Sequence, residues 1–278
     1  MAMTNLQRIK NILLSPNAWD AVVNDQEFFK DTIAEMSGVP HVNYHAEGGV
    51  LDHVKLAFAE MLKIPDHDWF DLLMVIFHDV GKRKALETNN GKNMAKHDVY
   101  SREWFVEWAN KFKLFADGIA STAKLRWDGE WIIENHMLAH HLADSSSVYR
   151  VMDVVTHECF PRLARLATAD SLATLAEDGT PHWPFSDVLS DPKVARWVGK
   201  PRPLPIVDRD DFIDLDVPRQ AIYDMVEFGL KLQLNNHTTD RARIINDVMS
   251  CDKIKKLIKD CRTQEALDEV IRWNQPSK

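Results

Sequence analysis

The segment HDWFDLLMVIFHDVGK, residues 67–82, is the most informative part of the sequence. After its first turn, the stretch 67–78 is apolar on almost every side, which is typical of a helix buried inside a protein. His78 and Asp79 end this stretch, and burying two such polar side chains is costly unless they have partners. A divalent cation can bind an imidazole nitrogen and a carboxylate oxygen together. The segment therefore predicts a buried helix that leads into a metal site.

Helical patterns continue on both sides of this segment. Apolar residues recur at three- and four-residue steps from Gly49 until Pro65, and aromatic residues do the same over 97–113. Further helices are expected over residues 118–126, 129–142, parts of 147–178 and 217–278. Residues 82–96 are expected to form a polar loop. Because no segment of useful length alternates like a strand, the predicted fold class is all-α, a helical bundle with an additional C-terminal helical region.

Three regions are expected along the chain. Residues 1–40 form an N-terminal extension of one or two short helices, and residues 41–178 form the core. Residues 179–278 begin with six prolines between Thr180 and Asp208 and return to helical patterns afterwards. Proline lacks an amide donor and clashes with the preceding turn. The proline-rich part is therefore expected to be irregular and to wrap the core.

Composition excludes several classes of protein. The chain has 278 residues and a net charge of −8, so it is not expected to coat nucleic acid in bulk. Its three cysteines, Cys159, Cys251 and Cys261, are too widely spaced for a thiolate zinc site or a disulfide framework. No apolar run approaches the 18 or more residues of a membrane span. A cytoplasmic location without a membrane partner is expected.

Two further polar residues fall on other predicted helices. His53 lies on the amphipathic helix that precedes the buried one, and Asp170 lies among small residues in RLATADSLATLAE. Together with His78 and Asp79, they place one or two inward polar groups on each of three helices. Metal sites in helical bundles are built in this way.

The ordered set of His53, His78-Asp79 and Asp170 resembles the signature of the HD-domain metal-dependent phosphohydrolases. Over roughly residues 40–178, the chain is most similar to the HD domain of bacterial CCA-adding tRNA nucleotidyltransferases. The similar stretches are 44–53 (YHAEGGVLDH), 78–82 (HDVGK), 97–98 (HD) with Ser101, and 134–136 (ENH) before 169–170 (AD). The family's second motif often reads Gly-His-Glu, whereas this chain has Lys96-His97-Asp98. Because the first forty residues cannot hold a nucleotidyltransferase head, CCA addition is not expected.

The resemblance implies roles for these residues. The predicted metal ligands are His53, His78, Asp79 and Asp170. Asp79 could bridge to a second ion, and His97 and His136 match positions that bind a second ion in some family members and contact the phosphate in others. One or two divalent ions are expected, from Mn, Fe, Co, Ni, Zn or Mg.

Basic residues follow the His-Asp pair. Segment 82–96 has a net charge of +4, which suggests an anionic substrate. Lys82 and Arg83 are predicted to bind the substrate phosphate, and Lys82 also to stabilise developing negative charge. His140 lies four residues after His136 on the same helix face. His140 and His141 are either further metal or phosphate ligands, or residues at a core edge or in a solvated turn.

The expected activity is hydrolysis of phosphate esters by metal-activated water. The resemblance implies a 2′,3′-cyclic phosphodiesterase or phosphatase acting on nucleotides or RNA ends. A nucleoside monophosphatase and a dNTP triphosphohydrolase are alternatives. A non-catalytic module that binds a nucleotide or a tRNA end is a further alternative, because about 100 residues follow Asp178, which is more than hydrolysis alone requires. Those residues could also form a lid or the interface of a homo-oligomer.

Overall fold

The structure is a computed structural model that describes residues 3–41, 48–115, 120–176, 180, 184–212, 217, 219–236, 239–256 and 258–260. These residues form helices joined by turns, with isolated bridges such as the antiparallel pair Pro40 and Gly49. The predicted all-α fold is confirmed. The chain divides into two units, the first of residues 1–144 with 154–198 and the second of residues 145–153 with 199–278.

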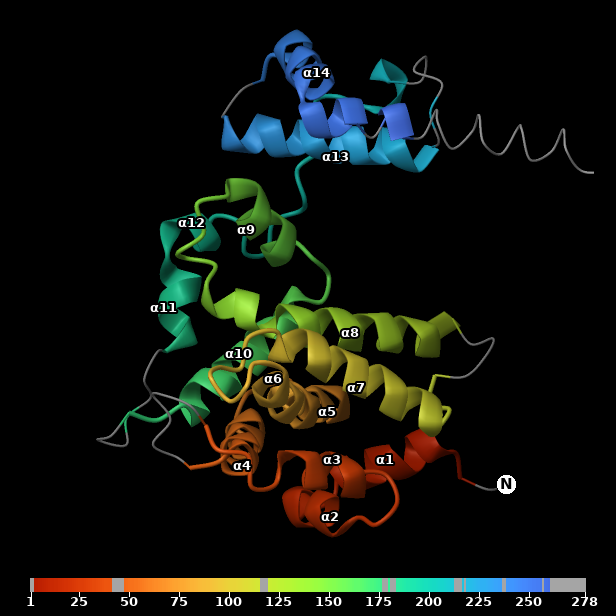
Figure 1. Cartoon of the computed structure of the whole chain (residues 1–278). Coiled ribbons are helices and arrows are strands. Elements are labelled where there is room, and N and C mark those ends of the chain that lie inside the picture. Colours follow the sequence, from red (N-terminus) through yellow and green to blue (C-terminus); the bar gives the residue numbers. More distant parts are fainter. Residues whose placement is uncertain are drawn as a thin grey trace, which may run out of the picture. The chain divides into compact units, whose positions relative to one another are not determined.

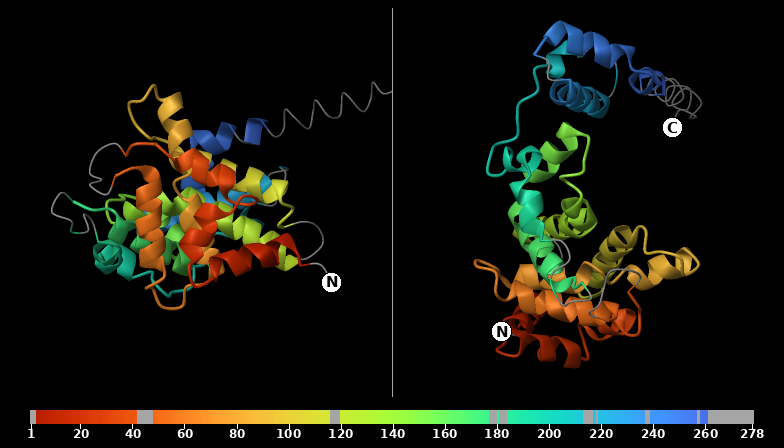
Figure 2. Two further views of the ribbon diagram at one scale, coloured as in Figure 1. Left: turned by 90° about the horizontal axis from the view of Figure 1, so that it is seen from below. Right: turned by 90° about the vertical axis from the view of Figure 1, so that its left-hand side faces the viewer.

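The N-terminal region of the first unit contains three helices rather than the one or two expected, namely α1 (Asn5–Leu13), α2 (Ala18–Asn24) and α3 (Lys30–Met36). The Thr4 hydroxyl caps α1 by accepting the amide of Gln7 at 3.2 Å. In sequence order these helices pack on one another, and α3 then packs on α4 (Val50–Met61). Figure 2 shows them together, in red, beside the orange helices.

Helix α5 (Trp69–Phe77) is the centre of the first unit, and all its residues from Phe70 to Phe77 are buried. It contacts α4, α7 (His97–Lys111), α8 (Ala120–His140) and α10 (Phe160–Ala173). Figure 1 shows α7 and α8 side by side, and they are in extensive contact. Because helices surround α5, its apolar side chains are buried on every side, as its sequence predicts.

An ion-pair network joins α5 to α10. Asp68 caps α5 by accepting the amides of Phe70 and Asp71, and it also binds Arg162 at 2.7 Å. Asp71 is 1 % exposed and binds both Arg162 and Arg165 at 3.0 Å. A buried carboxylate is stable only when it is paired in this way. The network fixes α10 against the helix that ends at the His-Asp pair.

Two predicted boundaries in this region are wrong. Residues 82–88 form α6 (Lys82–Thr88) instead of a loop, because KRKALET consists mostly of good helix formers and buries Ala85. The helices expected over 118–126 and 129–142 are a single helix, α8. Its Gly129 lies against Phe105, where an added Cβ would come within 2.7 Å of the ring. This glycine therefore allows close packing and does not end the helix.

The proline-rich segment also contains more helix than expected. It includes α11 (Phe185–Ser190) and the short α12 (Pro192–Ala195). Pro184 precedes the first helical residue of α11, and Pro192 is the first residue of α12. Proline is tolerated at both positions because the first turn of a helix needs no amide donor.

The second unit has its own small core. It contains the 3-10 turn η1 (Arg209–Asp211), α13 (Arg219–Asn235), α14 (Arg241–Ser250) and the first part of α9 (Val148–Val155). Helices α13 and α14 pack on each other, as Figure 1 shows in blue. One cluster of buried core residues in this unit consists of Val207, Phe212, Ile222, Met225, Ile244, Val248 and Ile254.

The expected domain boundary near residue 179 lies outside the described residues, as do residues 261–278. The division at 41 and 179 stays a prediction. Among the described residues, no helix is long and apolar enough to cross a membrane.

Candidate metal centre

Four buried side chains from three parts of the chain converge at the C-terminal end of α5. His53 comes from α4, His78 and Asp79 follow the last turn of α5, and Asp170 comes from α10. His53 Nε2 lies 2.9 Å from Asp170 Oδ1 and 3.6 Å from Asp79 Oδ2. His78 Nε2 lies 3.3 Å from Asp79 Oδ2 and 3.7 Å from Asp170 Oδ1. We call these four residues the first ligand group.

The other carboxylate oxygen of Asp79 faces two further histidines. His97 Nε2 lies 3.3 Å and His136 Nε2 3.8 Å from Asp79 Oδ1. These nitrogens come from the start of α7 and from α8, and all three residues are buried. We call Asp79, His97 and His136 the second ligand group. Asp79 belongs to both groups and presents one oxygen to each.

Backbone contacts orient three of these histidines. The Nδ1 atoms of His78, His97 and His136 each lie 2.6–2.9 Å from the carbonyl oxygen three residues earlier. A carbonyl only accepts hydrogen bonds, so each Nδ1 carries a proton and each ring directs its Nε2 atom towards the centre. A hydrogen bond of this kind at the far nitrogen fixes the orientation of a histidine that binds a metal.

The two Nε2 atoms of the second group lie only 3.1 Å apart. Because the Nδ1 protons of His97 and His136 are already used, two lone pairs would face each other unless a proton or a cation lies between them. Burial, together with the nearby His97 and His78, lowers the pKa of His136 to about 3. His136 is therefore neutral near pH 7, which is the form that binds metals.

The first group has an excess of negative charge. Burial alone would raise the pKa of Asp79 and of Asp170. Neighbouring histidines outweigh this effect at both carboxylates, and Lys82 does so at Asp79 as well. The pKa values of both carboxylates are therefore held well below the usual range. Burial also lowers the pKa of His78, yet the two carboxylates raise it to about 10. Among the described residues, His78 Nε2 has no hydrogen-bond partner. Such a site favours a cation.

Gly81 explains how α7 comes close enough to contribute His97. A Cβ at position 81 would lie 2.4 Å from the amide nitrogen of Ser101 and 2.5 Å from the carbonyl oxygen of His97. The Gly81 amide also donates to the Ser101 hydroxyl at 2.9 Å. Only glycine permits this approach of α7 to the turn after Asp79.

The two basic residues predicted to bind phosphate lie in different places. Lys82 is buried, and its ammonium lies 2.6 Å from Asp79 Oδ2 at the edge of the centre. Arg83 points to the end of α3, where its guanidinium donates to carbonyl oxygens of Glu35 at 2.8 Å and Ser37 at 2.7 Å. These contacts compete with the predicted role of Arg83 in phosphate binding.

The structure also separates His140 from His141. His140 Nε2 contacts Asp170 Oδ2 at 3.0 Å. The side chain of His141 is 65 % exposed and faces Asp144 at 3.8 Å, outside both ligand groups. The predicted roles of the two histidines in binding metal or phosphate remain predictions.

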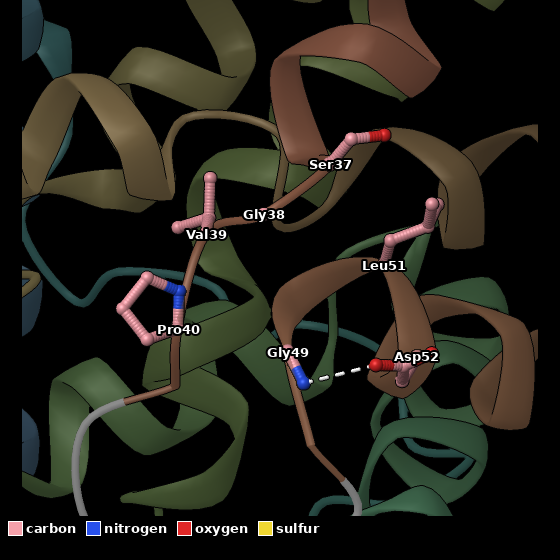
Figure 3. Close-up of a pocket in the computed structure, with 7 residues that line it drawn as sticks. All are labelled: Ser37, Gly38, Val39, Pro40, Gly49, Leu51 and Asp52. Carbon is pink, nitrogen blue, oxygen red and sulfur yellow. Dashed lines mark hydrogen bonds between the residues drawn. The ribbon is translucent and has the colours of Figure 1, made fainter.

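A separate hollow lies between the end of α3 and the start of α4. It is lined by Ser37, Gly38, Val39, Pro40, Gly49, Leu51 and Asp52, and Figure 3 shows the Gly49 amide donating to the Asp52 carboxylate, at 3.1 Å. It includes neither ligand group. His45 and Glu47, which the motif of residues 44–53 contains, lie outside the described residues.

A third group of potential ligands was not predicted. Asp128 on α8 lies near Glu158 and Cys159, which come just before α10. The Lys124 ammonium binds both carboxylates, at 2.8 Å and 2.9 Å, so the group already holds a cation of its own. About 30 residues separate Asp128 from Cys159 and no motif joins them, so no sequence pattern identifies this cluster.

Two sets of buried side chains could hold a metal ion, namely His53, His78 and Asp79, and Asp79, His97 and His136. Comparison with protein-family models, curated proteins and solved structures finds no match for this chain.

Proposed function

We propose that this protein is a metal-dependent phosphohydrolase that cleaves phosphate esters of nucleotides or of RNA ends. The observation that carries the proposal is the carboxylate of Asp79, which presents one oxygen to each of two groups of buried metal-ligating side chains. Centres that bind two ions through a shared carboxylate suit displacement at phosphorus, because both the attacking and the leaving oxygen can be stabilised.

The residues present fit one or two divalent ions. Imidazole and carboxylate ligands together suit Mn, Fe, Co, Ni or Zn. His53, His78, Asp79 and Asp170 would hold the first ion, and Asp79, His97 and His136 the second. A bound divalent ion supplies Lewis acidity and lowers the pKa of its water.

Exposure indicates the side from which a substrate would enter. The side chains of His53 and His78 are 0 % exposed, whereas those of Asp170, His97 and Lys82 are 12 %, 9 % and 8 % exposed. The phosphate would therefore meet the centre between the last three residues. Lys82 is the cation among them, and its three donors allow it to keep Asp79 and also to bind a phosphoryl oxygen. Its charge would stabilise the negative charge that develops there.

A phosphate-release screen tests the proposal. Nucleoside 2′-, 3′-, 5′- and 2′,3′-cyclic phosphates, together with dNTPs, are incubated with the metal-free protein plus Mn²⁺, Co²⁺, Ni²⁺ or Zn²⁺. We expect metal-dependent turnover of at least one class that Asp79→Asn abolishes. The control is Asp144→Asn, because this exposed carboxylate lies outside both ligand groups. Absence of turnover with every metal, or full turnover by Asp79→Asn, would refute the proposal.

A further inference from the structure

Asp170 uses its two carboxylate oxygens differently. Oδ1 faces the first ligand group, 2.9 Å from His53 Nε2 and 3.7 Å from His78 Nε2. Oδ2 turns away from these rings and lies 3.0 Å from His140 Nε2. A carboxylate held at its outer oxygen can rotate less, so its inner oxygen stays directed at the centre.

His140 is itself held on two sides. The Phe185 ring of α11 packs edge-on against it, with the ring centroids 5.8 Å apart. The Ser171 hydroxyl lies 3.5 Å from His140 Nδ1. If this hydroxyl donates to Nδ1, the proton of the neutral imidazole resides on Nε2, and Nε2 then donates to Asp170. Ser171, His140 and Asp170 thus form a chain of hydrogen bonds that leads to the first ligand group.

Helix geometry separates the roles of the two histidines on α8. His136 and His140 are four residues apart and therefore share one helix face. His136 Nε2 points at Asp79 and His97, within the second ligand group. His140 Nε2 instead contacts Asp170 at Oδ2, the oxygen that faces away from His53.

We propose that His140 is a positioning residue for the metal centre, and that its Nε2–H orients Asp170 as a ligand. The inference rests on the proposed metal site, but it makes its own claim. The hydrogen bond between His140 Nε2 and Asp170 Oδ2 then contributes to the affinity of the first ligand group for its ion. Residues that hydrogen-bond to a metal ligand typically contribute about 10- to 100-fold to the metal affinity.

The test compares two amides that differ only in reach. In His140→Gln, the amide nitrogen can occupy the place of Nε2, whereas the shorter side chain of His140→Asn cannot reach Asp170. Titration calorimetry with Mn²⁺ measures the dissociation constant of each variant, of His140→Ala and of the wild type. His67→Ala is the matched control, because this ring hydrogen-bonds the carbonyl of Ile64 in its own turn and belongs to neither ligand group. Urea unfolding without metal shows whether each variant is folded.

We expect His140→Asn and His140→Ala to bind Mn²⁺ about 10- to 100-fold more weakly than the wild type. His140→Gln and His67→Ala should remain within about threefold of it, well inside that range. Wild-type affinity in His140→Asn, or equal losses in the Gln and Asn variants, would overturn the positioning role alone. A wild-type protein that binds no Mn²⁺ would overturn both this inference and the proposed function. If His140→Ala does not fold, the Gln and Asn pair still decides the question.

Discussion

Replacing Gly81 by alanine should displace α7 and open the second ligand group. The new methyl would lie 2.4 Å from the Ser101 amide nitrogen and 2.5 Å from the carbonyl oxygen of His97, where ordinary contacts begin at 3.4 Å. Both contacted atoms belong to the backbone and cannot rotate away in a close-packed interior. Helix α7 must therefore move away by about 1 Å to restore an ordinary contact distance. Overpacking of this kind typically destabilises a protein by about 1–3 kcal/mol. His97 begins α7 and would move away from Asp79 with it.

Urea unfolding without metal and Mn²⁺ titration measure the two effects. We expect Gly81→Ala to lose about 1–3 kcal/mol of unfolding free energy. We also expect it to lose the binding that depends on His97, while His53, His78 and Asp170 remain in place. Ser101→Ala is the control, because it removes the hydrogen bond to Gly81 without adding a methyl group. If Gly81→Ala equals the wild type in stability and in Mn²⁺ binding, the close approach does not position His97 and the reasoning is wrong.

Three further predictions concern charges in the first unit. The pKa of His78 is raised to about 10 in the folded protein, above its value of about 6.5 in the unfolded chain. The protonated ring therefore contributes its full stabilisation to the unfolding free energy below about pH 6.5, and this contribution is lost as the pH rises towards 10. Without metal, in EDTA, the unfolding free energy should therefore fall by about 1.4 kcal/mol per pH unit between pH 7 and 9. Urea unfolding at a series of pH values measures this, and no fall over that range would contradict the prediction. Asp71→Asn removes the buried carboxylate that binds Arg165 and one of the two carboxylates that bind Arg162, which keeps Asp68. Urea unfolding should show a loss of about 3–5 kcal/mol, and a loss below about 1 kcal/mol would contradict this. Lys82→Met removes the ammonium next to Asp79 that faces the predicted phosphate site. Phosphate release with metal bound should therefore fall at least tenfold. Unchanged turnover would exclude a role of Lys82 in stabilising the phosphate.

The sequence was most informative where a residue's chemistry conflicts with its surroundings. His78 and Asp79 follow an apolar helix, and His53 and Asp170 lie on apolar helix faces. Such residues must face one another or a ligand once buried, and the structure brings the four together. The apolar pattern of α5 likewise predicted a buried helix.

Local patterns were less informative where tertiary contacts decide. The patterns over 118–126 and 129–142 suggest two helices, but both belong to α8, where Gly129 lies close to the Phe105 ring. Arg83 belongs to a basic segment that suggests phosphate binding, yet its guanidinium binds the end of α3, about 48 residues earlier in the chain. Adjacent in sequence, His140 and His141 differ because only His140 meets Asp170. None of these contacts has a signature in the neighbouring residues.

Metal content measured by equilibrium dialysis tests the central claim most directly. The metal-free wild type and Asp79→Asn are dialysed against micromolar Mn²⁺, and the bound metal is measured by mass spectrometry. Because Asp79 presents one oxygen to each ligand group, we predict one or two Mn²⁺ ions per wild-type chain and almost none in Asp79→Asn. Equal metal content in the two proteins, or none in the folded wild type, would contradict the account.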